Sequence, residues 1–284
     1  MARLESLRLI ARRAHEGVRN GERRSVRRGT SQEFADHRSY VTGDDLRFID
    51  WNLYGRLDKL FIKLFLEEED LVLALVVDTS ASMGFGAPET KLRLALRLAL
   101  SLGYIALLNQ EKVALLGGGD RLVSIDATVR GKSGLFPLVQ ALEKFKAEGK
   151  TNLNNILSRC GELLKKSGII VVFSDLLDVE GYDDGVLNLS SRGHEVILIH
   201  TLCSDELKPQ LEGDLSLKDS ETGDLLDVTF SPQMREYYTN ALSNFLNRSR
   251  EFALKHGFSY ILWDGLASIE TMVTTVLRER GILK

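Results

Sequence analysis

The chain has 284 residues, of which 44% are hydrophobic and 27% are charged, as is typical of globular proteins. Its formal net charge of -3 gives no overall attraction for nucleic acid or for a membrane surface. The two cysteines, Cys160 and Cys203, form no Cys-x-x-Cys pair, which argues against a zinc cluster or a disulfide framework. No signal peptide and no membrane-spanning segment is recognisable. We therefore expect a cytoplasmic protein.

The first 66 residues differ in composition from the rest of the chain. Residues 1–28 contain nine arginines and three glutamates, and apolar residues recur there at helical spacing. This pattern predicts an amphipathic helix with a basic face. Residues 21–65 mix glycine, aromatic and charged residues, so we expect irregular structure with a short strand near 60–66. We interpret residues 1–66 as an N-terminal extension and residues 67–284 as a second domain.

An apolar run, Leu71–Val77, ends abruptly at Asp78 and is typical of a strand buried on both faces. Strand and helix patterns then alternate to the end of the chain. The expected strands are 112–116, 121–125, 169–173, 195–202 and 260–263, and the expected helices are 91–109, 135–146, 153–166, 185–191, 234–255 and 267–280. The alternation predicts a three-layer α/β domain with a mostly parallel sheet. The glycine loop between 112–116 and 121–125 is too short for a crossover, so these two form an antiparallel edge hairpin. Residues 214–230 are expected to form a solvent-facing hairpin.

Polar side chains follow the buried strands at the edge of the predicted sheet. Asp78, Ser80 and Ser82 end the first strand, and Asp175 follows the strand 169–173. Thr151 lies in a loop just before a helix and should meet them there. Ligands bind at the carboxyl ends of strands in open α/β sheets, and hard oxygen donors suit Mg²⁺. We therefore expect Mg²⁺, with Mn²⁺ or Ca²⁺ as alternatives. A cation with mostly neutral ligands would accept a carboxylate from a partner.

Two resemblances follow from these residues. Asp78-x-Ser80-x-Ser82, with Thr151 and Asp175 downstream, resembles the metal-ion-dependent adhesion site of von Willebrand factor A domains. This resemblance implies that residues 67–284 form a von Willebrand A-like domain with a Rossmann-like fold. The chain also resembles the bacterial family called domain of unknown function 58, through the SETGD segment, Arg235-x-x-Tyr238 and the stretch RRGTSQEFADHRSYVTGDDLRFIDWNLYGRLDKLFIKLFLEEED. This resemblance implies an adaptor or co-chaperone-like partner of a MoxR-type AAA+ ATPase, and therefore a protein that is not an enzyme. Some members carry N-terminal transmembrane helices, which are not recognisable here.

Other functions compete with the adhesion hypothesis. A Mg²⁺-dependent phosphohydrolase would use Asp78 as its nucleophile, but such enzymes usually need a second acid two residues later, where this chain has Ser80. A nucleic-acid-binding protein would use the Arg-rich N-terminus, which the slightly acidic whole chain disfavours.

Charged and aromatic residues also cluster within residues 38–56. The cluster consists of Arg38, Tyr40, Asp44, Asp45, Arg47, Asp50, Trp51 and Arg56. It either pins the N-terminal segment onto the sheet through buried ion pairs or forms a docking surface for a partner, and the sequence leaves both hypotheses open.

Overall fold

The computed structural model describes residues 7, 9, 34–65, 71–119, 122–124 and 128–284. Contacts divide the chain into two units. The smaller unit is Gly17–Asp70, and the larger unit combines Met1–Glu16 with Leu71–Lys284. The predicted boundary at residue 66 falls near the end of the smaller unit, while the chain before residue 17 belongs with the larger one.

The smaller unit contains a two-stranded sheet and a short helix. Strand β1 (Phe34–Ser39) pairs antiparallel with β2 (Phe61–Phe65), which confirms the short strand expected there. Between them lie the 3-10 turn η2 (Leu46–Phe48) and helix α1 (Trp51–Leu57). The expectation of irregular structure was wrong at β1 and α1. Helix α1 begins where Asp50 accepts hydrogen bonds from the backbone N–H groups of Asn52 and Leu53, satisfying two donors that a helix start leaves free.

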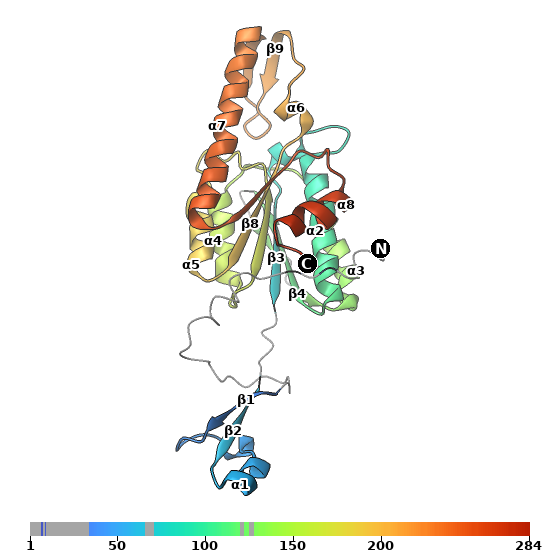
Figure 1. Ribbon diagram of the computed structural model, residues 1–284. Helices are drawn as coiled ribbons and strands as arrows, with labels where there is room; N and C mark the ends of the chain where they lie inside the picture. Colours follow the sequence, from blue (N-terminus) through green and yellow to red (C-terminus); the bar gives the residue numbers. More distant parts are fainter. Residues whose placement is uncertain (1–6, 8, 10–33, 66–70, 120–121, 125–127) are drawn as a thin grey trace. The chain divides into compact units, whose positions relative to one another are not determined.

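The larger unit is built on one mixed sheet (Figure 1). Its path among the described residues is β11-β8-β7-β3-β4-β5, and β6 also pairs with β4. Only β5 and β6 run antiparallel to their neighbour, so the prediction of a mostly parallel sheet with an antiparallel edge is confirmed. The strands are β3 (Val72–Asp78), β4 (Lys112–Gly118), β5 (Leu122–Ser124), β6 (Val129–Arg130), β7 (Ile169–Ser174), β8 (Glu195–Thr201) and β11 (Ser259–Trp263).

Strand β3 lies in the middle of this sheet because both of its faces are apolar. Leu73, Leu75 and Val77 pack on one side, and Ala74 and Val76 pack on the other. Hydrogen bonds to β4 and β7 satisfy its backbone on both edges. The alternation of side chains along a strand thus divides the core into two clusters.

Helices cover both faces of the sheet, giving three layers (Figure 1). One cluster receives residues from α2 (Lys91–Leu108), α3 (Leu135–Leu142) and the C-terminal segment. The other receives residues from α4 (Leu153–Leu163), α5 (Asp183–Ser191) and α7 (Pro232–His256). Helix α7 ends at Gly257, whose positive φ of 72° supplies the expected C-cap.

A separate hairpin accompanies the first part of α7 (Figure 1). Strand β9 (Gly213–Lys218) pairs antiparallel with β10 (Leu225–Phe230), as the alternating pattern predicted. The short helix α6 (Ser204–Leu207) precedes it. The hairpin is not hydrogen-bonded into the main sheet in the described structure.

Several predicted boundaries differ from the structure. Helices α3 and α4 end earlier than expected, and the last predicted helix is divided into α8 (Ile269–Thr271), the π-helical turn η5 (Met272–Val276) and α9 (Leu277–Glu279). The predicted N-terminal helix lies outside the described residues except at Leu7 and Leu9. Both of these leucines are buried in the core, and Leu9 forms an antiparallel bridge with Leu283. In the described part of the chain, no helix combines the length and hydropathy needed to span a membrane.

Candidate functional site

Asp78 occupies the carboxyl end of β3 and is only 1% exposed. Its Oδ1 atom accepts the Ser80 backbone N–H at 2.9 Å, and its Oδ2 atom accepts the Ser174 hydroxyl at 2.6 Å. The hydroxyls of Ser80 and Ser82 are 3.1 Å apart. The structure therefore brings together the three residues of the Asp-x-Ser-x-Ser pattern and adds a serine from the end of β7.

The environment of Asp78 disfavours an isolated negative charge. Burial and the nearby Asp175 carboxylate raise the pKa of Asp78 to about 6, although hydrogen bonds from Ser174 and Ser80 oppose the shift. Among the described residues, no lysine, arginine or histidine forms an ion pair with Asp78. A buried carboxylate in this state would be stabilised by a cation, and hydroxyl oxygens to complete a shell are adjacent.

Asp175 lies directly after β7 and is fully buried, but it is paired with a lysine. Its Oδ2 atom is 2.7 Å from Lys91 Nζ, and its Oδ1 atom accepts the Leu177 backbone N–H at 3.1 Å. Lys91 Nζ also contacts Glu206 at 2.5 Å. Burial favours a lower pKa for Lys91, but the carboxylates of Asp175 and Glu206 outweigh it, so the pKa of Lys91 is raised. The ammonium group therefore stays charged between its two partners.

The loop that carries Thr151 is held against the end of β3 by backbone hydrogen bonds. Glu148 donates its N–H to the Thr79 carbonyl at 2.9 Å, and Ala81 donates to the Gly149 carbonyl at 3.0 Å. Close approach depends on Gly119, where a Cβ atom would lie 2.5 Å from the Lys150 carbonyl oxygen. The structure thus places Thr151 at the same edge as Asp78.

Thr151 is bonded to a glutamate from the β9–β10 hairpin. Glu221 Oε1 accepts the Thr151 hydroxyl at 2.5 Å, and Glu221 Oε2 accepts the Thr151 backbone N–H at 3.1 Å. Helix α4 starts just beyond, where Asn152 accepts the Asn155 N–H at 3.0 Å. The Glu221 carboxylate is therefore already hydrogen-bonded to Thr151, one of the predicted metal ligands.

Four residues of this site were not among the predicted ligands: Lys91, Ser174, Glu206 and Glu221. Lys91 carries a weak signal, because a lysine at the start of a helix that is apolar on more than one face has little access to solvent. Glu206 carries none, since it lies in a polar segment that resembles a solvent-exposed turn. Glu221 belongs to the SETGD segment that supports the family resemblance, but the sequence does not indicate which group it contacts. The hairpin was predicted to face solvent, yet Glu221 at its tip is half-buried against Thr151.

No cluster of three histidine, cysteine, aspartate or glutamate side chains suited to a metal ion occurs in the residues that the structure describes. A cation at the Asp78 edge would therefore depend on serine and threonine hydroxyls and on water. Mg²⁺ usually keeps several waters and needs only one or two carboxylates, so this donor set fits it.

The charged cluster of residues 38–56 lies within the smaller unit, where it forms local ion pairs. Arg38 is 2.8 Å from Asp44, and Arg47 is 2.7 Å from Asp45. Asp50 contacts His37 at 3.0 Å and Lys63 at 3.4 Å. These pairs are partly exposed rather than buried, and Trp51 is 62% exposed. Tyr40 is half-buried and Arg56 is exposed.

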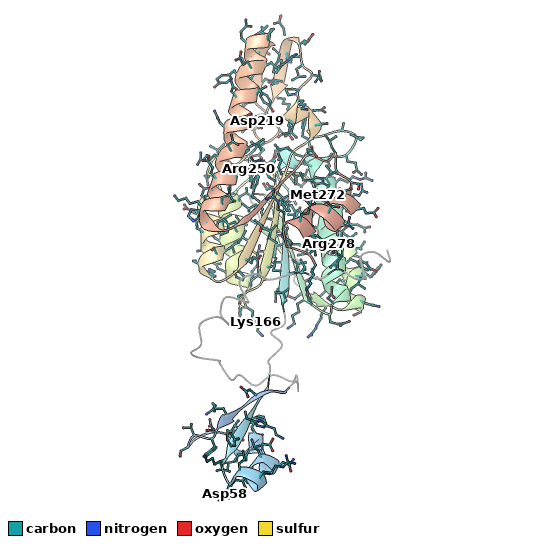
Figure 2. All side chains as sticks on the ribbon, in the orientation of Figure 1. Asp58, Lys166, Asp219, Arg250, Met272 and Arg278 are labelled. Atoms are coloured by element: carbon teal, nitrogen blue, oxygen red, sulfur yellow. The ribbon has the colours of Figure 1, made fainter. Side chains whose placement is uncertain are left out.

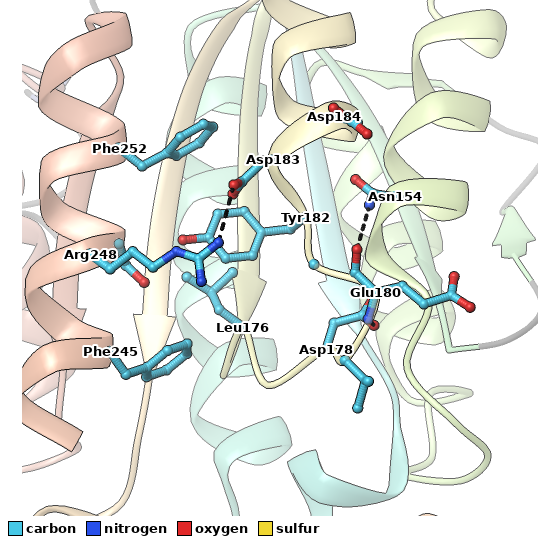
Figure 3. Close-up of a pocket in the computed structure, with 13 residues that line it drawn as sticks. Asn154, Leu176, Asp178, Glu180, Tyr182, Asp183, Asp184, Phe245, Arg248 and Phe252 are labelled. Carbon is cyan, nitrogen blue, oxygen red and sulfur yellow. Dashed lines mark hydrogen bonds and ion pairs between the residues drawn. The ribbon is translucent and has the colours of Figure 1, made fainter. Parts of the chain in front are cut away.

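A cavity of about 330 Å³ lies between α7 and the loop after β7 (Figure 3). Phe245 and Phe252 of α7 line it together with Tyr182, and carboxylates surround it. These carboxylates have local structural roles. Asp178 accepts the Leu153 N–H at 2.7 Å, and Asp183 lies 3.8 Å from Arg248. Two of the carboxylates around the cavity are thus already occupied, one by the start of α4 and one by Arg248 of α7.

The structure and its edge site define a class: an α/β protein with a mostly parallel sheet, an antiparallel edge and buried polar residues at its carboxyl end. The family described as "Protein of unknown function DUF58" matches residues 36–245, and the chain belongs to this family. Uncharacterized proteins of Mycobacterium bovis and Mycobacterium tuberculosis are 26% identical over 244 residues, covering 84% of this chain and 77% of each relative.

Solved structures with similarity to this chain include the conserved hypothetical protein BatB from Bacteroides thetaiotaomicron. It is 13% identical, with a TM-score of 0.49 over 74% of this chain and 98% of that one. An aerotolerance-related membrane protein from Bacteroides fragilis is 16% identical, with a TM-score of 0.44 over 69% of this chain and 92% of that one.

Proposed function

We propose that this protein is a non-enzymatic interaction module that binds a divalent cation at the sheet edge and docks an acidic side chain of a protein partner. The observation that carries the proposal is the state of Asp78. It is a buried carboxylate with no ion-pair partner in the described structure, and it lies beside the hydroxyls of Ser80 and Ser82. A cation would offset the cost of its charge.

Asp78, Ser80 and Ser82 would hold the cation, with Thr151 contributing from the facing loop. Asp175 is already bound to Lys91, so its contribution would come through water. We propose Mg²⁺, with Mn²⁺ and Ca²⁺ as alternatives that also take oxygen ligands. When bound, the cation supplies a positive position that an outside carboxylate can occupy. The residue pattern resembles that of a von Willebrand factor A adhesion site, which supports this assignment.

The partner we propose is a MoxR-type AAA+ ATPase, which the family resemblance implies. The exposed Trp51 and the partly exposed ion pairs beside it in the smaller unit give that partner a second surface to contact. Aromatic and arginine side chains are enriched at protein interfaces, which supports this assignment.

The proposal predicts that the intact protein binds Mg²⁺ or Mn²⁺ in calorimetry and that Asp78→Ala abolishes this binding. Asp227→Ala is the matched control, because it removes an exposed carboxylate from strand β10 and should bind like the wild type. Equal metal binding by Asp78→Ala and the wild type would contradict the site.

Partner capture tests the second half of the proposal. The wild type should retain the AAA+ partner in Mg²⁺ and release it in EDTA, and Asp78→Ala should retain less. Capture of the same partner in EDTA, with Asp78→Ala equal to the wild type, would rule out docking through the cation. Turnover of phosphate esters that is lost in Asp78→Asn would instead support an enzyme.

A further inference from the structure

The hairpin tip carries a carboxylate to the position where the proposed partner would offer its own. We propose that Glu221 is an internal acidic ligand whose contact with Thr151 closes the site, so that a partner must displace it. This inference rests on the proposed function, because it identifies how access to that same site is regulated.

The contact of Glu221 is specific in its geometry. Its two oxygens accept from the hydroxyl and the backbone N–H of Thr151, at 2.5 Å and 3.1 Å. A carboxylate with one donor for each oxygen is held in orientation as well as in place. Thr151 is also the one residue of the proposed site that comes from the facing loop, so Glu221 contacts the site from the side of that loop.

The turn of the hairpin is organised to present Glu221. Asp219 accepts the backbone N–H groups of Glu221 and Thr222, at 2.7 Å and 2.9 Å. Gly223 follows with a positive φ of 79°, which closes the turn. Figure 2 shows Asp219 above the carboxyl end of the sheet.

The same backbone bonds fix Asp219 in its charged form. The pKa of Asp219 is lowered, first by the N–H group of Thr222 and then by that of Glu221. The turn that presents Glu221 is therefore held by its own hydrogen bonds, and the contact between Glu221 and Thr151 connects it to the loop.

The hairpin can leave the site without disrupting the core. It forms a separate two-stranded sheet whose residues are mostly exposed. Isolated two-stranded hairpins are marginally stable, so their opening costs less than opening the buried strands. Its base is tied by Arg235, which donates to the Leu211 carbonyl at 3.0 Å. The hairpin thus has a hydrogen-bonded anchor at its base, while the contact between Glu221 and Thr151 holds its tip to the loop.

A tethered ligand lowers the apparent affinity of any competitor, because the competitor binds only the fraction of molecules in which the tip is free. Removing Glu221 should therefore strengthen binding of an acidic probe while leaving the metal ligands unchanged. A docked Glu221 should also protect the Thr151 amide from hydrogen exchange.

The experiment compares the full chain as wild type, Glu221→Ala and the control Asp227→Ala. The probe is a fluorescein-labelled hexaglutamate peptide in Mg²⁺, with hexaglutamine as its neutral counterpart, followed by fluorescence anisotropy. Glu221→Ala should bind hexaglutamate about tenfold more tightly than the other two proteins. Exchange of the peptide covering residues 149–153, measured by mass spectrometry, should be faster in Glu221→Ala alone.

The other possible outcomes each contradict the inference, and they differ in which part of it they reject. Equal hexaglutamate affinity of wild type and Glu221→Ala, with EDTA abolishing both, rejects the internal ligand and leaves the proposed function standing. Unchanged exchange in Glu221→Ala rejects the contact itself. Faster exchange without peptide binding by any variant rejects docking of acidic side chains, and the regulatory role with it.

Discussion

Two regions of this molecule contain ion pairs that differ in burial and in the distance along the chain between their partners. In the smaller unit, Arg38 and Asp44 are six residues apart, and their side chains are 39% and 23% exposed. At the sheet edge, Lys91 and Asp175 are 84 residues apart, with side chains only 1% and 0% exposed. The first pair closes a local turn, whereas the second connects a helix to the end of a distant strand.

The difference in burial determines how much each ion pair affects stability. The charges of an exposed pair stay hydrated whether or not they are paired, so removal of one partner changes the free energy of unfolding little. A buried pair has lost its hydration, and removal of one partner leaves a charge that nothing compensates. The sheet-edge residues should therefore control stability and the proposed metal binding, and the local pairs of the smaller unit should not.

Lys91→Met should give the largest effect. The substitution keeps an unbranched side chain that is one atom shorter, but it leaves Asp175 and Glu206 without their ammonium partner. We expect a loss of about 3–5 kcal/mol in the free energy of unfolding, measured by urea denaturation at pH 7 in EDTA.

A triple variant separates charge from packing. Lys91→Met combined with Asp175→Asn and Glu206→Gln removes the uncompensated carboxylates and should recover most of the lost stability. A triple variant that remains as unstable as Lys91→Met would show that the loss comes from packing, and the comparison between the two regions would fail.

Asp78→Asn should raise the free energy of unfolding, whereas Lys91→Met lowers it. Because the pKa of Asp78 is raised to about 6, the folded state binds a proton more tightly than the unfolded chain does. The contribution of protonated Asp78 to the stability of the folded state is fully present below pH 4 and is lost as the pH rises through 6. In EDTA at pH 7, Asp78→Asn should therefore be about 1–3 kcal/mol more stable than the wild type.

The pH profile is the decisive part of this measurement. The advantage of Asp78→Asn should shrink between pH 6 and pH 4, because protonation makes the wild-type side chain neutral as well. Asp227→Asn, on the exposed face of the hairpin, should follow the wild type throughout. An advantage of Asp78→Asn that does not vary with pH would mean that its charge is not the cause.

The sequence predicts the sheet better than it predicts the site. Apolar runs such as 71–77 and 169–173 identify buried strands, because burial on both faces requires apolar side chains at every position. Asp78, Ser80 and Ser82 are also predictable, since they are adjacent along the chain. Lys91 and Glu221 are not, because their contacts depend on segments that return from 84 and 70 residues away. Periodicity indicates which face is buried, but it does not identify the partner of a charge.

Arg38→Ala should give the smallest effect and so completes the comparison. The pKa of Asp44 is lowered, first by the hydrogen bond from Arg38 and then by the Val41 N–H, so its contribution is present above pH 4 and is lost as the pH falls further. Because the Val41 N–H also donates to Asp44, at 2.8 Å, the turn should keep part of its support in the variant. We expect a urea midpoint close to that of the wild type at neutral pH, with any difference decreasing as salt is added. A large, salt-independent shift would show that this exposed pair behaves like the buried one, against the distinction between the two regions.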